Sequence, residues 1–280
     1  MMKTLHKFWA VIVLTFRESF AKKTFIAFFI LSSLLHLFFI FALNVDVVDG
    51  AMAMVKILGQ DVNPSQEIDI RKMIIGVESV ISTVVFTGGI FLSIFATANL
   101  IPTMLERGYI ELLISKPLSR TMLLTGRFLG ALSIMIFNVS YLIAGTWLIL
   151  SLKTGFWHWP YLYSIPMVIA AFAIVYALLA LVGVTTRSPG VSIMVAYSVL
   201  FFSPLLVEKD KIYAFLSSKI YYYFLEGLYH TLPKTFELGE INQALVMGRC
   251  VESFSALWSS SIVGAALLFT TIFIFSKKDF

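Results

Sequence analysis

Long apolar runs with few or no charged residues dominate this sequence. The first, Thr24 to Leu43, contains no Lys, Arg, Asp or Glu. At about 1.5 Å rise per residue, a helix of this length crosses a hydrocarbon core roughly 30 Å thick. Only 13% of the chain is charged, against about 25% in an average soluble protein. Because lipid offers no hydrogen-bond partner to the backbone, the runs predict an all-α, polytopic membrane protein.

The runs predict six transmembrane helices within a single membrane domain over residues 1–280. The expected spans are 24–43, 73–101, 121–150, 161–184, 191–207 and 253–275. Residues 44–72 carry many acidic residues and an Asn63-Pro64 turn signal, which predicts a solvated loop with room for a short helix. Residues 208–252 are too interrupted to cross, so we expect short re-entrant or interfacial helices before the last span.

The first segment, residues 2–21, predicts an amphipathic helix rather than a signal peptide. Lys7, Arg17 and Glu18 interrupt its apolar residues, and no small-residue cleavage site follows. Phe8, Ile12 and other apolar residues recur at helical spacing on one face. This pattern is typical of a helix that lies in the membrane interface.

The distribution of charge predicts the orientation. The side that holds both termini carries twelve Lys and Arg and a net charge of +8, whereas the other side carries nine and a net charge of −3. Basic residues favour the cytoplasmic side, so we expect both termini in the cytoplasm of a bacterial inner membrane. Topology accounts for the overall charge of +5, and no basic face interleaved with stacking aromatics points to nucleic acid.

Residues that would hold a metal or form a disulfide are scarce. Cys250 is the single cysteine of the sequence, which excludes an intramolecular disulfide. No Cys, His and carboxylate cluster has the spacing of a metal site. We therefore expect no cofactor in this chain.

The most informative segment is the polar stretch between the second and third spans. Read as a helix over 104–117, it places Leu105, Tyr109, Leu112 and Leu113 on one apolar stripe, and Pro117 ends it. A short amphipathic helix between two spans is suited to lie along the cytoplasmic face of the membrane. From these physical features alone, an ordinary interfacial loop accounts for the segment equally well.

This segment resembles the coupling helix of type-2 ABC transporter permeases. The family pattern is an acidic residue, Gly-Thr, Glu, paired leucines, Pro-aliphatic-Ser-Arg, and a basic residue early in the third span. The matching residues are Glu106, Gly108, Glu111, Leu112, Leu113, Pro117-Leu118-Ser119-Arg120 and Gly126-Arg127. One departure is Tyr109, where the family has threonine; we expect a surface position that tolerates an aromatic.

The resemblance implies a permease subunit that works with a separate cytoplasmic ABC ATPase. Such permeases pair as a homodimer or with a paralogous permease, and ATP and Mg bind the ATPase. The sequence has no Gly-x-x-x-x-Gly-Lys-Ser/Thr loop, so we expect no ATPase activity, and no enzyme, in this chain. The expected function is export of a substrate that the sequence does not identify. The expected ATPase contact is formed by Glu106, Arg107, Gly108, Glu111, Leu112, Lys116 and Pro117, with Arg120 and Arg127 anchoring the third span.

Three other functions compete with this interpretation. The complex could transmit ATP-driven motion to an extracytoplasmic partner without transport, with residues 208–252 as the docking surface. A secondary carrier or a membrane scaffold is less favoured, because no acidic partner shares the depth of His36, and Glu78 lies near the outer end of the second span. An intramembrane enzyme lacks a nucleophile or metal motif. We interpret His36, Asn99 and Asn138 as residues that serve helix packing.

Overall fold

Most of the chain is placed by a computed structural model. The residues it describes are 2–21, 23–41, 43–48, 52–57, 60–61, 68–106, 108–114, 118–208, 210–212 and 219–278.

Within these residues, five helical segments are long and apolar enough to cross a membrane. They are α3 (Ile70–Val84) continued by η1 (Val85–Gly89) and α4 (Ile90–Thr97), α6 (Arg120–Thr154), η3 (Trp159–Tyr163) continued by α7 (Ser164–Thr186), α8 (Pro189–Val207) and α12 (Ser255–Lys277). A sixth helix, α2 (Lys23–Phe41), has a shorter described apolar part, Ile26–Phe41. The prediction of a helical, multi-pass membrane protein is therefore confirmed for the body of the chain.

Local sequence signals explain where these helices begin and end. The Ser119 hydroxyl accepts from the Met122 N–H and caps the start of α6, and Gly155 ends that helix in the left-handed conformation. Ser188 caps α8, and Pro189 occupies its first turn, where a missing N–H costs nothing. The polar link after α7 is therefore a tight turn between two helices.

A small antiparallel sheet connects α2 to α3, where the sequence predicted a solvated loop with a short helix. The pairing of β1 (Leu43–Val48) with β2 (Met52–Ile57) sets Leu43 opposite Ile57, and β3 (Gln60–Asp61) and β4 (Ile68–Asp69) also pair with β2. The alternation of apolar and polar residues in β1 has the period of a strand. The prediction of a loop was wrong for these strands, because it was made from the many acidic residues and not from the alternation.

The apolar core centres on α7. Its buried side chains include Phe172, Val175 and Tyr176, and the helix contacts α6, α8 and α12. Gly264 of α12 packs on Ile174: a Cβ at Gly264 would lie 3.2 Å from the Ile174 Cα. His36 is buried, and its Nε2 lies 3.2 Å from the Leu142 carbonyl oxygen of α6, so its predicted packing role is confirmed.

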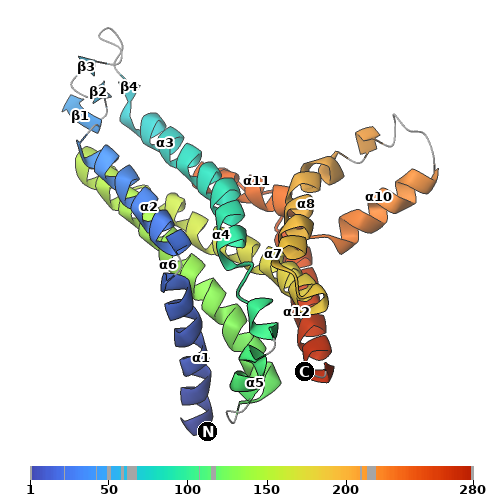
Figure 1. Ribbon diagram of the computed structural model, residues 1–280. Helices are drawn as coiled ribbons and strands as arrows, with labels where there is room; N and C mark the ends of the chain where they lie inside the picture. The colour runs from blue at the N-terminus through green and yellow to red at the C-terminus, as the bar shows by residue number, and fades with distance from the viewer. Residues whose placement is uncertain are drawn as a thin grey trace.

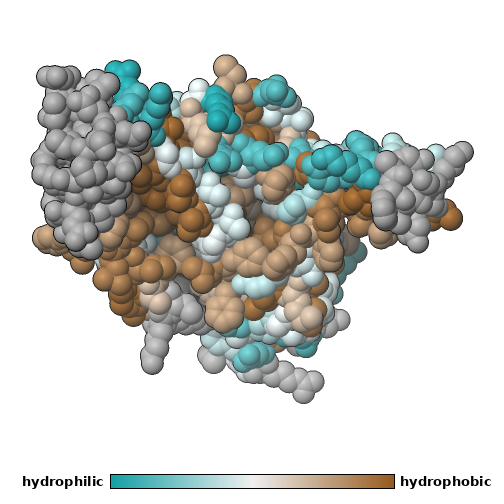
Figure 2. All heavy atoms as spheres, turned by 90° about the horizontal axis from the view of Figure 1, so that it is seen from above, coloured by the Kyte–Doolittle hydropathy of each residue, from teal (hydrophilic) through white to brown (hydrophobic). Residues whose placement is uncertain are grey.

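Two short helices precede the last span, as predicted. The buried face of α11 (Thr235–Val246) includes Leu238 and Ile241, and this helix packs between α3, α7 and α8. By contrast, α10 (Lys219–Thr231) extends away from the body (Figure 1). In Figure 2, which looks down on this end of the molecule, a band of hydrophilic residues runs across the face toward α10.

The chain ends of the structure lie together. Figure 1 places both termini near α5 (Tyr109–Ile114), at the end of the bundle opposite the small sheet and α10. This arrangement separates the molecule into two polar ends with apolar helices between them.

The N-terminal helix α1 (Met2–Ala21) packs along α6 at two glycines, Gly126 and Gly130. A Cβ at Gly126 would lie 2.7 Å from a Val11 methyl carbon, and one at Gly130 would lie 2.5 Å from the Thr15 Cβ. Small residues four apart let two helices approach closely. The face of α1 that packs on α6 thus carries Val11 and Thr15. These are different residues from Phe8 and Ile12, which the sequence analysis placed on the apolar face.

We expect Gly130→Ala to destabilise the protein, because the added methyl must push α1 away from α6. Overpacking of this kind costs about 1–3 kcal/mol. The thermal midpoint in detergent measures the effect. The matched control is Gly76→Ala, since a Cβ at Gly76 meets no described atom within 4 Å; an equal response of the two variants would contradict close packing at Gly130.

Candidate functional site

The predicted coupling segment forms two short helical pieces rather than one helix over 104–117. The first is η2 (Thr103–Leu105) and the second is α5. Between them Gly108 has a φ of +84°, a conformation that interrupts a right-handed helix and favours glycine. Arg107, Lys116 and Pro117, which the sequence assigned to the ATPase contact, lie outside the described residues, as does the side chain of Leu112.

The two pieces and the residues between them expose carboxylates and bury apolar side chains. Leu105 and Ile110 are buried against the helical core. Glu106, Gly108 and Glu111 are exposed. The predicted apolar stripe is therefore correct at Leu105 but missed Ile110, because the break at Gly108 changes which residues face inward.

Arg127 occupies the centre of a buried polar network at this end of the molecule. Its side chain is 1% exposed and binds Glu18 of α1 through both terminal nitrogens, one of them 3.0 Å from Glu18 Oε1. The same nitrogen, Nη2, donates to the Tyr109 hydroxyl at 2.6 Å, and that hydroxyl donates to Glu18. Arginine suits such a site because its planar fork binds two oxygens of one carboxylate.

The network corrects the expectation for Tyr109, which is no freely tolerant surface position. Its ring lies half-buried, and its hydroxyl joins α5 to α1 and α6. Burial raises the pKa of this hydroxyl, and the hydrogen bond to Glu18 raises it further. The threonine of the family pattern could not reach both partners with so short a side chain.

Arg120 anchors a different contact from Arg127. Its guanidinium donates to the carbonyl oxygens of Ser276 and Lys278, at 3.1 and 2.6 Å, at the end of α12. A cation there complements the negative end of the helix dipole. The Lys278 ammonium in turn donates to the Val184 carbonyl at 2.6 Å, and burial, with the neighbouring Arg187, lowers its pKa. The start of α6 and the ends of α7 and α12 are thereby tied together.

A second buried polar cluster joins α3, α7 and α11 to the link that follows the other end of α6. Glu78 of α3 is fully buried, and its Oε2 lies 2.6 Å from Nδ1 of His158, in the link between α6 and η3. One turn further along α3, Ser82 accepts from the Asn242 amide of α11 at 2.7 Å and lies 2.8 Å from the Ser164 hydroxyl. The sequence analysis did not identify this partner of Glu78, because it comes from a distant loop.

Sequence reasoning found Arg120 and Arg127 but missed the residues that satisfy them. Glu18 is an isolated acid in an otherwise basic and apolar segment, and Tyr109 departs from the family pattern. Those two anomalies were the available signals. His158 carried none, since it sits within an aromatic run, Trp157 to Trp159, that is typical of a membrane interface.

The chain matches no known protein-family model, and no curated protein is significantly similar to it. The resemblance to type-2 ABC permeases therefore depends on the residues of this segment and on the arrangement of the helices.

Replacing Arg127 should weaken the contact between α1, α5 and α6. Breaking a buried ion pair costs about 3–5 kcal/mol; because the Glu18 side chain is 31% exposed, water can rehydrate it, and we expect the lower end for Arg127→Ala. Tyr109→Phe removes one hydroxyl and should cost about 1 kcal/mol. Unfolding in detergent checks both.

The matched control for Tyr109→Phe is Tyr223→Phe, since Tyr223 is 72% exposed on α10. An unchanged unfolding free energy in Arg127→Ala would show that the network does not hold these helices.

Acid should destabilise the cluster around Glu78 and His158, because His158 takes up a proton. Burial lowers the pKa of this imidazole, so the folded protein resists a proton that the unfolded chain accepts below about pH 6.5. The stability that neutral His158 contributes is complete above that pH and is lost as the pH falls through the folded value. The thermal midpoint should fall between pH 7.5 and 5, and His158→Gln should flatten the fall.

The control is His230→Gln, because His230 is exposed and bonds Glu226 within α10. A midpoint that instead rises in acid, and loses that rise in His158→Gln, would mean that an imidazolium pairs with Glu78, the titratable group in contact with it.

Proposed function

We propose that this chain is the permease subunit of an ATP-driven ABC exporter, with its ATPase on a separate cytoplasmic polypeptide. The observation that carries the proposal is the connection of the exposed acidic segment to the helices behind it. Glu106 and Glu111 face solvent, while Tyr109, two residues before Glu111, is bonded to Arg127 and Glu18. A force applied to this surface reaches α1 and α6 directly.

Six spans in the bacterial inner membrane, with both termini cytoplasmic, fit the arrangement of the helices. The two termini lie at one end of the bundle (Figure 1), which requires an even number of crossings. Among the described residues, five helices are long enough to cross, and we propose α2 as the sixth. In this orientation the end with α5 is the more basic side of the sequence, as cytoplasmic surfaces are.

In the proposed cycle, ATP and Mg bind the ATPase, whose closure displaces the coupling segment. The buried network transmits this displacement to α1 and α6, and the Arg120 contacts transmit it to the end of α12. The permease acts as a homodimer or with a paralogous subunit. The helix α1 lies at the cytoplasmic interface, and α10 and α11 lie at the outer face as interfacial or re-entrant helices.

Transmission of force to an extracytoplasmic partner is the second candidate, and α10 is the observation that favours it. This helix extends from the body (Figure 1), with Ile220 79% and Tyr223 72% exposed. Its base is fixed, since the Tyr229 hydroxyl donates to Glu237 of α11 at 2.7 Å. Deleting residues 219–228 should abolish activity in this case but leave transport intact in an exporter that uses α10 as a lid.

Affinity purification of the tagged chain in mild detergent, with mass spectrometry and an ATPase assay, tests the main proposal. We expect a phosphate-loop ATPase to copurify. Glu111→Lys should reduce its recovery roughly tenfold, because reversing an interface charge costs over about 1.4 kcal/mol. The control is Glu252→Lys, an exposed carboxylate near the start of α12.

Two results would contradict the proposal. Recovery of the chain alone in every detergent would favour a secondary carrier or a scaffold. Full ATPase recovery and stimulation by Glu111→Lys would show that the contact lies elsewhere.

A further inference from the structure

An open groove runs between α2 and the α3–η1–α4 helix, with α6 as its floor. It consists of two adjoining cavities, of about 570 and 290 Å³, that share Phe28, Leu31 and Leu92. The larger is lined almost entirely by apolar side chains. Together they have the size of a site that holds a small amphiphile.

The π-helical turn η1 widens the larger cavity. This turn contains Gly88, and a Cβ built there meets no described atom within 4 Å. Gly88 lines the cavity, so the space beside it is empty because a side chain is missing. π-Helical turns of this kind recur at functional sites.

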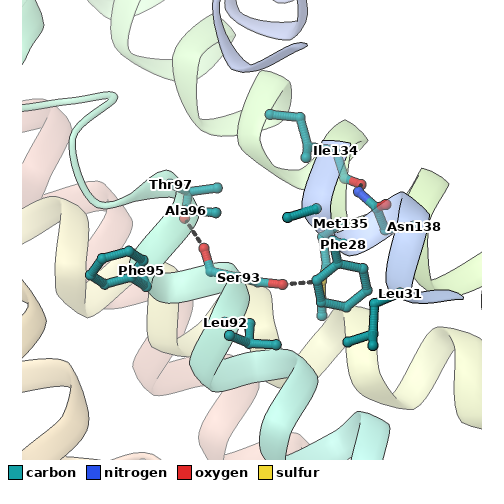
Figure 3. A pocket seen from close by; sticks show the side chains of 11 residues that line it. Phe28, Leu31, Leu92, Ser93, Phe95, Ala96, Thr97, Ile134, Met135 and Asn138 are labelled. Atoms are coloured by element: carbon teal, nitrogen blue, oxygen red, sulfur yellow. Dashed lines mark hydrogen bonds between the residues drawn. The ribbon is translucent and has the colours of Figure 1, made fainter. Parts of the chain in front are cut away.

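The smaller cavity is the polar end of the groove (Figure 3). Ser93 and Thr97 of α4 and Asn138 of α6 contribute its polar side chains. Asn138 is 4% exposed and lies near the middle of α6, deep in the proposed span. Among the described residues, the hydrogen bond that its amide donates stays within α6, whereas the predicted packing role implied a bond to a neighbouring helix.

Each of these three side chains donates one hydrogen bond within the described part of the chain. The Asn138 amide donates to the Ile134 carbonyl at 3.0 Å, the Thr97 hydroxyl to the Ser93 carbonyl at 2.6 Å, and the Ser93 hydroxyl to the Met135 sulfur at 2.9 Å. The Asn138 Oδ1 has no hydrogen-bond partner among the described residues, although it is buried. An unpaired acceptor at this depth is costly, and water is scarce there.

The chemistry of the lining selects the ligand. Among the described residues that line the groove, Asn138 Oδ1 is the buried polar atom without a partner, and a donor such as a hydroxyl would satisfy it. Within the described part of the chain, no charged side chain lines either cavity, so neither a phosphate nor an ammonium would find a counter-charge. We propose that the groove binds a neutral, hydroxyl-bearing amphiphile whose alkyl chain lies along Gly88. On binding, the Asn138 side chain turns so that its Oδ1, covered in this structure, accepts from the ligand hydroxyl.

Such binding requires only the chain in a bilayer, so it is independent of the ATPase contact proposed above. It also differs from ordinary contact with lipid, because it depends on a hydrogen-bond donor.

The test uses photoaffinity labelling in phosphatidylcholine vesicles that contain the full-length protein. The probe is a monoacylglycerol with a diazirine in its acyl chain. The comparison probes are the same molecule with both hydroxyls methylated, and a diazirine lysophosphatidic acid. Mass spectrometry locates the labelled residues. We expect the monoacylglycerol to label α2 and α4 beside the groove about fivefold more than either comparison probe, in line with a membrane hydrogen bond of roughly 1 kcal/mol.

Two variants separate the two halves of the proposal. Asn138→Leu keeps the side-chain volume and removes the acceptor, so labelling should fall to the level of the methylated probe. Gly88→Leu fills the apolar part and should suppress labelling by all three probes. Their controls are Asn99→Leu, at an exposed turn residue, and Gly76→Leu, where a Cβ meets no described neighbour and no groove is lined; both should label like the natural protein.

Several outcomes would overturn the inference. Equal labelling by the monoacylglycerol and its methylated form, unchanged by Asn138→Leu, would reduce the groove to a lipid-facing surface. Preference for lysophosphatidic acid would contradict the neutral class. Absence of labelling at the groove by every probe would show that the groove holds no amphiphile. Thermal midpoints of the variants show whether each is folded when labelled.

Discussion

The burial of one guanidinium, that of Arg127, imposes the arrangement of α1, α5 and α6. A charge that is 1% exposed must be paired and hydrogen-bonded, or its desolvation would exceed what packing supplies. Its partners come from segments far apart in sequence, Glu18 in α1 and Tyr109 in α5. All three must be in place at once. Gly126 and Gly130 make this possible, because they admit α1 close enough for Glu18 to reach the guanidinium.

The opposite end of the molecule has a different kind of contact. There the side chains of Ser82, Ser164 and Asn242 form a chain of neutral hydrogen bonds that joins α3, α7 and α11. Beside it, the Glu78–His158 pair joins α3 to the link between α6 and η3. Neutral hydrogen bonds in membranes contribute about 0.6 kcal/mol each and exchange partners easily. The helix α10, which extends beyond these helices, is joined at its base to α11 by the hydrogen bond from Tyr229 to Glu237.

Sequence alone could predict the spans, because an apolar run of about twenty residues without charge is rare outside helices that cross a membrane. The caps at Ser119 and at Ser188-Pro189 are local chemistry, and the expected spans, which began at 121 and 191, lie within two residues of these helix starts. Sequence alone could not identify the partner of Arg127 or of Glu78, since both depend on which helices meet. The break at Gly108 was equally hidden: glycine permits a left-handed residue but does not require one.

The Arg127 network and the groove share one helix, α6. This helix carries Arg127 near its start and Asn138 three turns later, on the floor of the groove. One of the two walls of the groove is α2, and this helix follows α1 after a single residue. Because packed interiors transmit displacement rather than absorb it, α5 cannot move with Tyr109 still bonded to Arg127 unless α1 and α6 move too. Any such motion changes the spacing of α2 and α6, and with it the width of the groove between them.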